Sequence, residues 1–150
     1  MVTGKMINMT ERVSYVSQVR INWQFGKKKD GDRYEGEFKK GKFNGNGVLY
    51  YSNKSYYKGE FQDDAKEGNG TETYPNGSVY TGQFSKDKPH GKGVLVKGEY
   101  SYEGEFVDGL KEGQGKEHYK LATYEGQFFK GFKHGKGKWA HHNGNNYGNF

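Results

Sequence analysis

The sequence predicts an all-β fold: an elongated, single-layer antiparallel β-meander of repeated hairpins, twisted into a trough. The chain repeats itself every 22 or 23 residues, each repeat alternates apolar and polar residues with a period of two, and glycine recurs at fixed positions. Leu, Ile, Val and Phe supply only 25 of the 150 residues, too few for an ordinary globular interior, whereas 13 Tyr and 10 Phe argue against disorder. The apolar side chains are therefore expected along one face of a sheet.

The first predicted element is an N-terminal capping segment, residues 1–33. Apolar side chains alternate with polar ones across residues 12–25, which predicts a strand. Three valines there also fit a helical spacing, so a short helix over residues 10–18 is an alternative, although β-branched residues disfavour it. Residues 26–32 are rich in glycine, lysine and aspartate and predict a basic turn. The segment is expected to cap the array, since terminal units of a repeat protein need a different outer edge.

The predicted repeat array, residues 34–150, contains five copies of Tyr-x-Gly-x-Phe, each followed by a Gly-x-Gly pair. The alternation places Tyr, Gly and Phe on one face of a strand of about five residues and Glu, Gln or Lys on the other. Gly-x-Gly begins the return strand, and an aromatic ring is expected to lie across the bare glycine backbone. The units are predicted at 34–56, 57–79, 80–101, 102–123 and 124–145, with a partial sixth at 146–150.

These residues resemble the MORN (membrane occupation and recognition nexus) repeat, whose full pattern, including a Tyr-Pro-Asn-Gly turn, stands almost literally between Tyr57 and Tyr80. The sequence departs from that turn at residues 50–54, 97–99 and 119–121, which puts the turn geometry in question. The resemblance implies five full repeats and a partial sixth. It also implies an interaction or scaffold module of the kind found in cytoskeletal, ciliary and membrane-junction proteins.

No arrangement of residues in the sequence supports catalysis, a metal or a cofactor. The carboxylate pairs Glu35/Glu37 and Glu103/Glu105 recur on the polar face and are expected to form cross-strand ion pairs with lysines rather than to act as acid and base. The Gly-x-Gly pairs lack the following helix that a phosphate loop needs. The chain has no cysteine, and its five histidines show no ligand spacing. We therefore expect a protein that is not an enzyme.

The strip of repeated aromatic rings is the predicted partner-binding site, as a trough that accepts a helical or extended segment of another protein. Its predicted residues are Tyr34, Phe38, Tyr57, Phe61, Tyr80, Phe84, Tyr102, Phe106, Tyr124 and Phe128. The expected function is assembly of a larger ciliary or cytoskeletal complex.

The net charge of +6 suggests an alternative, a peripheral tether that binds acidic phospholipids through lysine-rich turns. The predicted lipid-binding residues are Lys39, Lys40, Lys42, Lys86, Lys88, Lys130 and Lys133. Self-association through the strand edge at 146–150 is a third option, and nucleic acid is not expected as a partner. With neither a membrane span nor a secretory signal in the sequence, we expect an intracellular location in the cytoplasm, cytoskeleton or cilium, with membrane association as an option.

Overall fold

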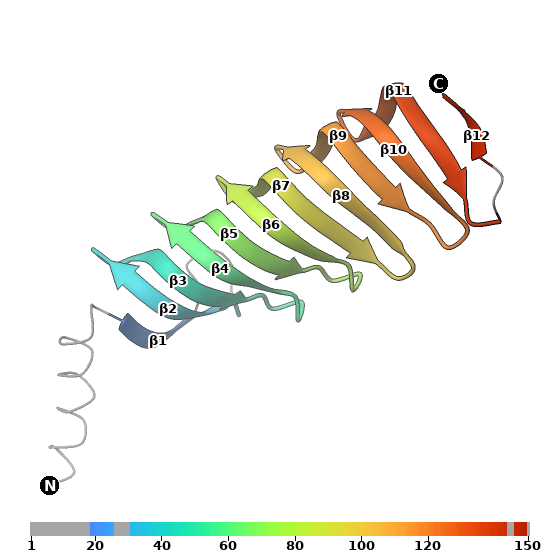
Figure 1. Ribbon diagram of the computed structural model, residues 1–150. Helices are drawn as coiled ribbons and strands as arrows, with labels where there is room; N and C mark the ends of the chain where they lie inside the picture. The colour runs from blue at the N-terminus through green and yellow to red at the C-terminus, as the bar shows by residue number, and fades with distance from the viewer. Residues whose placement is uncertain (1–18, 26–30, 144–145, 150) are drawn as a thin grey trace, which may run out of the picture.

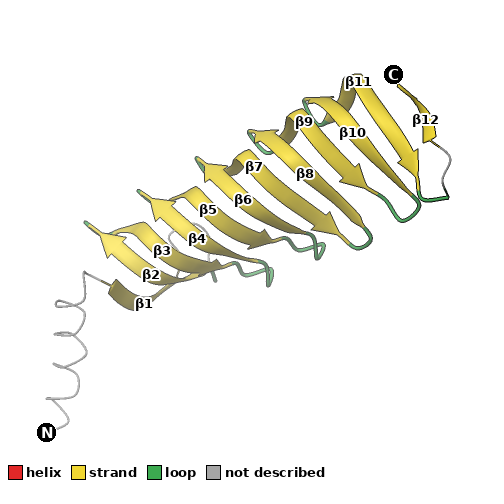
Figure 2. Cartoon of the chain, viewed as in Figure 1, coloured by secondary structure: helices red, strands yellow, loops and turns green. Residues whose placement is uncertain are grey.

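The described part of the chain forms one open antiparallel sheet of twelve strands, and every strand pairs with its neighbours in sequence (Figure 1). The computed structural model describes residues 19–25, 31–143 and 146–149, and in these ranges every regular element is a strand (Figure 2). The strands are β1 Val19–Phe25, β2 Arg33–Lys39, β3 Lys42–Tyr50, β4 Tyr56–Gln62, β5 Ala65–Thr73, β6 Val79–Ser85, β7 Lys88–Lys97, β8 Tyr100–Val107, β9 Leu110–His118, β10 Ala122–Phe129, β11 Phe132–His141 and β12 Asn146–Asn149.

This architecture confirms the predicted single-layer meander. Strands β2 to β11 have seven to ten residues, longer than expected, because pairing continues on both sides of the Tyr-x-Gly-x-Phe core. Strand β1 covers the later part of the strand predicted over residues 12–25. The earlier part, the alternative helix over residues 10–18 and most of the basic turn lie outside the described residues.

Five two-residue turns succeed one another along one long edge of the sheet (Figure 1). Both central residues of each turn have positive φ, and the second is glycine in three of the five turns. This is the type I′ geometry, whose twist matches that of the flanking strands. The turn residues are Lys40-Gly41, Asp63-Asp64, Lys86-Asp87, Asp108-Gly109 and Lys130-Gly131.

Backbone hydrogen bonds tie the second to fifth of these turns to the preceding repeat. The second turn residue donates its N–H to a carbonyl one repeat earlier, as in Asp64 to Phe43 (3.0 Å) and Gly109 to Pro89 (2.8 Å). Where the second turn residue is Asp, its side chain also accepts the N–H of that same residue one repeat earlier, as in Phe43 N–H to Asp64 (2.8 Å). Pro89 has no N–H, and Gly109 opposite it has no carboxylate.

Two of the turns at the opposite edge share one geometry despite different sequences. In residues 74–78 the Ser78 N–H donates to the Asn76 side chain (2.9 Å), and Gly77 has φ +82°. Residues 51–55 repeat this arrangement with Asn53 as the acceptor and Lys54 at φ +71°. The departure from Pro-Asn-Gly at residues 50–54 therefore leaves the turn intact.

A row of ten paired glycines crosses strands β2 to β11 in continuous register. The glycines are Gly36, Gly47, Gly59, Gly70, Gly82, Gly93, Gly104, Gly115, Gly126 and Gly137. On one face, the Tyr two residues before every second glycine lies across the pair and donates its hydroxyl to the next carbonyl, as in Tyr57 to Glu60 (2.8 Å). We call this row the glycine row, and it explains how a ring can pack directly on a sheet.

The same face carries the core, a continuous ladder of edge-to-face aromatic rings. Tyr57 contacts Phe61 of its own strand at 5.0 Å between centroids and Phe84 of the next repeat at 4.9 Å. Tyr80 repeats this with Phe84 and Phe106, both at 5.0 Å. Because each motif Tyr of the first four repeats bridges two Phe rings, every repeat is packed against the next without a second layer.

Candidate interaction sites

The structure places the predicted partner-binding rings in the core. Nine of the ten, all except Phe38, retain no more than 3% of their surface exposed, and Phe38 is half-buried. Their contact area is used by neighbouring rings, glycine backbone and turn side chains. The prediction that this strip offers docking anchors therefore needs correction: on the sheet described here, the accessible contact surface lies elsewhere.

Charged side chains complete the ring face at two places that the sequence analysis did not identify. Lys66 and Glu72 form a buried ion pair with 2.6 Å between Nζ and Oε1, opposite Phe61 and Tyr57 on the paired strand. Glu117 is buried between Lys111 and Lys133, each within 2.6 Å. All three lysines pack against rings as well as carboxylates, although only Lys66 is buried, Lys111 is half-buried and Lys133 stays exposed.

The pKa of Glu117 shows how strongly this cluster holds its charge. Burial alone raises the pKa of the carboxyl, but hydrogen bonds from Lys111, Lys133, Tyr119 and Tyr100 outweigh burial and bring the pKa down to about 2. By contrast, burial raises the pKa of the Tyr80 and Tyr102 hydroxyls to about 12. The cluster is thus an ionised, fully partnered element of the core.

A sequence signal for these pairs did exist. The two positions that face the rings on each return strand are six residues apart and change together: Phe43 with Leu49, Lys66 with Glu72, Pro89 with Leu95 and Lys111 with Glu117. Apolar residues thus accompany Leu, and Lys accompanies Glu. In the fifth repeat Trp139 replaces the acid, and Lys133 reaches back to Glu117 instead.

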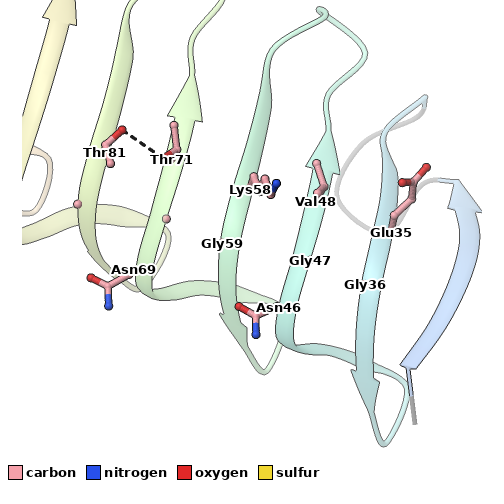
Figure 3. Close-up of a pocket in the computed structure, with 12 residues that line it drawn as sticks. Glu35, Gly36, Asn46, Gly47, Val48, Lys58, Gly59, Asn69, Thr71 and Thr81 are labelled. Atoms are coloured by element: carbon pink, nitrogen blue, oxygen red, sulfur yellow. Dashed lines mark hydrogen bonds between the residues drawn. The ribbon is translucent and has the colours of Figure 1, made fainter. Parts of the chain in front are cut away.

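On the opposite face, a groove runs across the strands above the glycine row. Its first section, of about 720 Å³, extends over strands β2 to β6. Figure 3 shows Asn46 and Asn69 on one side of the glycines and Glu35, Val48, Lys58, Thr71 and Thr81 on the other. The floor is backbone, and the two walls are mostly polar side chains that alternate with the rings of the core, with Val48 as an apolar member.

Two further sections continue this groove toward the C-terminal repeats. The second, of about 710 Å³, shares Thr81 and Gly82 with the first, and the third, of about 560 Å³, shares Gln114 and Glu125 with the second. We call the three together the polar groove. Its N-terminal walls carry mainly amides and hydroxyls, whereas its C-terminal walls carry acidic and basic side chains, among them Lys92, Glu103, Lys116, Glu125 and Lys138.

The Glu or Gln three residues after each motif Tyr has a structural role beside this groove. Glu60 accepts the Asn69 N–H at 2.5 Å, and Gln83 accepts the Lys92 N–H at 2.8 Å. These bonds secure a bulge in which the first glycine of Gly-x-Gly has φ between +60° and +92°. The expected cross-strand ion pairs are thus only part of the picture, as in Lys116 with Glu125 at 3.8 Å.

Most of the predicted lipid-binding lysines are exposed along the edge of type I′ turns. Six of them lie in or beside these turns with exposed side chains: Lys39, Lys40, Lys42, Lys86, Lys88 and Lys130. Lys133 is 35% exposed but differs, because its side chain lies on the ring face and bonds Glu117 and Tyr119. This corrects its predicted placement among the turn lysines, and we call the other six lysines the basic edge.

Neither a metal site nor a spanning helix is found among the described residues. Nowhere in residues 31–143 do three or more His, Asp or Glu side chains gather closely enough to hold an ion. In the part of the chain that the structure describes, no helix has the length and apolar character needed to cross a bilayer.

An open array of β-hairpins with a glycine row and a ring ladder defines a class of repeat protein. The family model of the MORN repeat matches residues 34–56, 57–79, 80–100, 102–120 and 124–146, well over half of the chain. The chain belongs to the MORN repeat family, whose repeats are noncatalytic modules that generally bind proteins or membranes. A search among curated proteins finds no match to the chain. The partial sixth repeat at 146–150 stays a prediction.

Proposed function

We propose that this protein is a non-enzymatic scaffold subunit that docks a segment of a partner protein in the polar groove. The observation that supports this is the continuity of the groove over ten strands, from Glu35 to Lys138, on the face that the core leaves free. At about 4.8 Å per strand the groove is roughly 43 Å long. It would accept about 13 residues of extended chain or about 29 residues of helix.

The groove walls define the chemistry of this partner segment. Amide and hydroxyl groups in the N-terminal half favour hydrogen bonding, and the mixed charges of the C-terminal half favour a segment that carries both signs. The aromatic rings of this chain, which the sequence analysis predicted as anchors for the partner, are buried in the core and are not part of the proposed groove site. As part of the same proposal, docking would serve assembly of a larger cytoskeletal or ciliary complex in the cell.

Site-specific photocrosslinking tests the groove. A benzophenone amino acid at Thr81, between the first two sections, should crosslink one continuous segment of one partner in native extract. Lys120, exposed at the other edge of the sheet, provides the control position. Asn69→Arg, which adds bulk to the wall, should abolish the Thr81 crosslink while the thermal transition is kept. Equal crosslinking from both positions, or no loss in the Asn69 variant, would contradict the proposal.

A second candidate function is a peripheral tether for acidic phospholipids. The exposed basic edge supports it, since a lysine near an anionic surface contributes about 1 kcal/mol. Flotation with phosphatidylserine vesicles should show binding at low salt that fades as ionic strength rises. Neutralising Lys39, Lys40 and Lys42 should weaken it more than neutralising Lys116, Lys136 and Lys138 on the polar face. Failure to bind at low salt would exclude this function.

Self-association through the edge at 146–150 also remains a proposal. Among the described residues, strand β12 is the outermost strand of the sheet and pairs only with β11, so one side of its backbone is available to a strand of a second copy. Light scattering of the full chain and of a chain lacking residues 146–150 tests this. Monomers in both cases would reject it.

A further inference from the structure

The turn edge changes character in the last two repeats, where four apolar side chains are exposed. Val107 and Leu110 flank one turn, and Phe129 and Phe132 flank the next. Their exposed fractions are 42%, 48%, 47% and 77%. We call these four residues the tip patch. The two turns are stacked, because the Gly131 N–H bonds the Lys111 carbonyl at 2.9 Å.

The equivalent positions of the first three repeats are polar or small. They hold Lys39 and Lys42, then Gln62 and Ala65, then Ser85 and Lys88. The fold therefore does not require apolar residues at these places, since the same turn forms without them. The tip patch must be explained by something outside the sheet.

The backbone N–H groups at these two tips are hydrogen-bonded within the protein, as burial in a medium poor in water requires. The Asp108 N–H bonds His90 Nδ1 (3.4 Å), and the Lys130 N–H bonds the Glu112 carboxylate (2.9 Å). The second residue of each turn bonds a carbonyl one repeat earlier. Burial of the tips in a bilayer interface would therefore leave these four donors satisfied, which removes a main cost of insertion.

Charge on the same edge indicates which apolar medium the tips would meet. The Lys130 ammonium lies 5.2 Å from the Phe129 ring centre, so its charge and an apolar ring are presented together. Toward the first repeat the edge carries five further exposed lysines, Lys86 and Lys88 in the third repeat and Lys39, Lys40 and Lys42 in the first, with Asp63, Asp64 and Asp87 between them. Basic side chains in this excess are complementary to anionic headgroups. Because the turns follow one another along a single edge, they can meet a surface together (Figure 1).

We propose that the tip patch inserts into the interface of an anionic bilayer, while the lysines of the basic edge bind headgroups. This inference rests on the lipid-binding function proposed above and adds an apolar anchor and an orientation: the turn edge faces the membrane, with the last two repeats deepest. The polar groove would then stay open to a protein partner.

A charge-neutral double variant tests the anchor without loss of lysine. Phe129→Gln with Phe132→Ala installs the residues that the second repeat carries at these positions, so the turn is expected to fold. Its affinity for phosphatidylcholine vesicles containing phosphatidylserine should fall about tenfold. Leu121→Gln, at an equally exposed apolar residue on the opposite edge, is the matched control and should not change affinity.

A second variant separates a bilayer from a protein as the occupant. Asp108→Asn removes the one acidic side chain between the two apolar flanks of its turn, and it should strengthen binding to anionic vesicles about fivefold. Since the chain has no cysteine, Leu110→Cys carries a single environment-sensitive dye. Its emission should shift to the blue with vesicles, whereas a dye at Leu121→Cys should not shift.

The outcomes distinguish the anchor from the tether on which it rests. If the unmodified chain binds no vesicle at low salt, both are overturned. If it binds, but the double variant binds equally well and the dye at position 110 does not shift, the anchor is overturned and the electrostatic tether stands. Loss of a protein partner in the double variant, with unchanged vesicle binding, would assign the tip patch to that protein instead.

Discussion

At the scale of single residues, the two glycines of each Gly-x-Gly pair have different roles. The first, such as Gly68, has φ +65° and lies at a bulge, so its backbone conformation is the reason for glycine. The second, such as Gly70, lies in the glycine row under a Tyr ring, so glycine is required because the ring leaves no space for a side chain. A side chain is excluded in both places, but by different physical causes.

Gly59→Ala should cost about 3 kcal/mol of unfolding free energy, because the new Cβ would meet the Gly70 Cα at 2.5 Å and the Asn69 carbonyl at 2.6 Å. Backbone atoms cannot move away cheaply. Gly77→Ala is the control: its Cβ meets no atom within 4 Å, and only its positive φ is strained, so about 1 kcal/mol is expected. Urea unfolding of both variants measures the difference, and equal losses would show that packing over the glycine row is not the cause.

Glu117→Gln should destabilise the chain by about 2 to 3 kcal/mol, because two lysines lose their counter-charge in a mostly buried site. Glu125→Gln, whose partner Lys116 is exposed and 3.8 Å away, should change stability by less than about 0.5 kcal/mol. Equal effects of the two substitutions would show that burial does not set the strength of the cluster.

The pH dependence of Glu117 follows from its depressed pKa. Because the folded-state pKa, about 2, lies below the unfolded value near 4.5, the carboxylate stabilises the fold fully above about pH 5. This stabilisation is lost as pH falls toward 2. Thermal unfolding at a series of pH values should show the decline in the parent chain and a smaller one in Glu117→Gln. Identical slopes would contradict the assignment.

At the scale of elements, hydrogen bonds link successive hairpin turns in a ladder. These bonds depend on whether the previous repeat has a backbone N–H at the facing position. Asp64 and Asp87 accept an N–H from residues 43 and 66, whereas Gly109 faces Pro89, which has none. The identity of a turn residue is therefore determined by its neighbour 20 or more residues earlier as well as by local turn chemistry.

Two glycine substitutions test this ladder. Gly131→Asp places a carboxylate where Asp64 and Asp87 have theirs, next to the backbone of Lys111, whereas Gly109→Asp places one next to Pro89. Both substitutions introduce the same strain at positive φ. The Gly131 variant should therefore be more stable than the Gly109 variant by about 1 kcal/mol, the contribution of one hydrogen bond. Differential scanning calorimetry compares them directly. No difference, or the reverse order, would refute the role of the donor.

At the scale of the whole molecule, stability is transmitted from each hairpin to the next, since each strand pairs only with its sequence neighbours. The ring ladder carries the packing part of this coupling, because the motif Tyr of each of the first four repeats contacts Phe rings of two repeats. A break in the middle should therefore separate the array into two parts that open independently.

Tyr80→Ala provides that break and should remove about 3 to 5 kcal/mol from the central repeats. Hydrogen exchange followed by mass spectrometry should then show the largest loss of protection in β6 and β7, with less loss toward β2 and β11. Tyr56→Ala, at a half-exposed ring outside the ladder, should leave the pattern unchanged. A uniform loss along the sheet in Tyr80→Ala would mean that the chain opens as one cooperative unit.

The repeat spacing and the alternation within Tyr-x-Gly-x-Phe were sufficient to predict the sheet, its order and the face on which each ring lies. Both depend on local rules, the period of a strand and the preference for short hairpins, so they can be read from residues close in sequence. The turn at residues 51–55 could not be judged in this way. Its glycine position holds Lys54, and only the bonds around Asn53 show that the geometry is kept.

The sequence by itself thus determined that this is an open array of hairpins with Tyr and Phe on one face and glycine beneath the rings. Only the tertiary structure decided which surfaces are available: the rings are buried, the polar groove is open, and the Lys133 ammonium bonds Glu117 on the ring face while Lys130 stays at the turn edge. The physical reason is that exposure depends on neighbours one repeat away, and a residue's own position on a strand carries no information about how closely they approach.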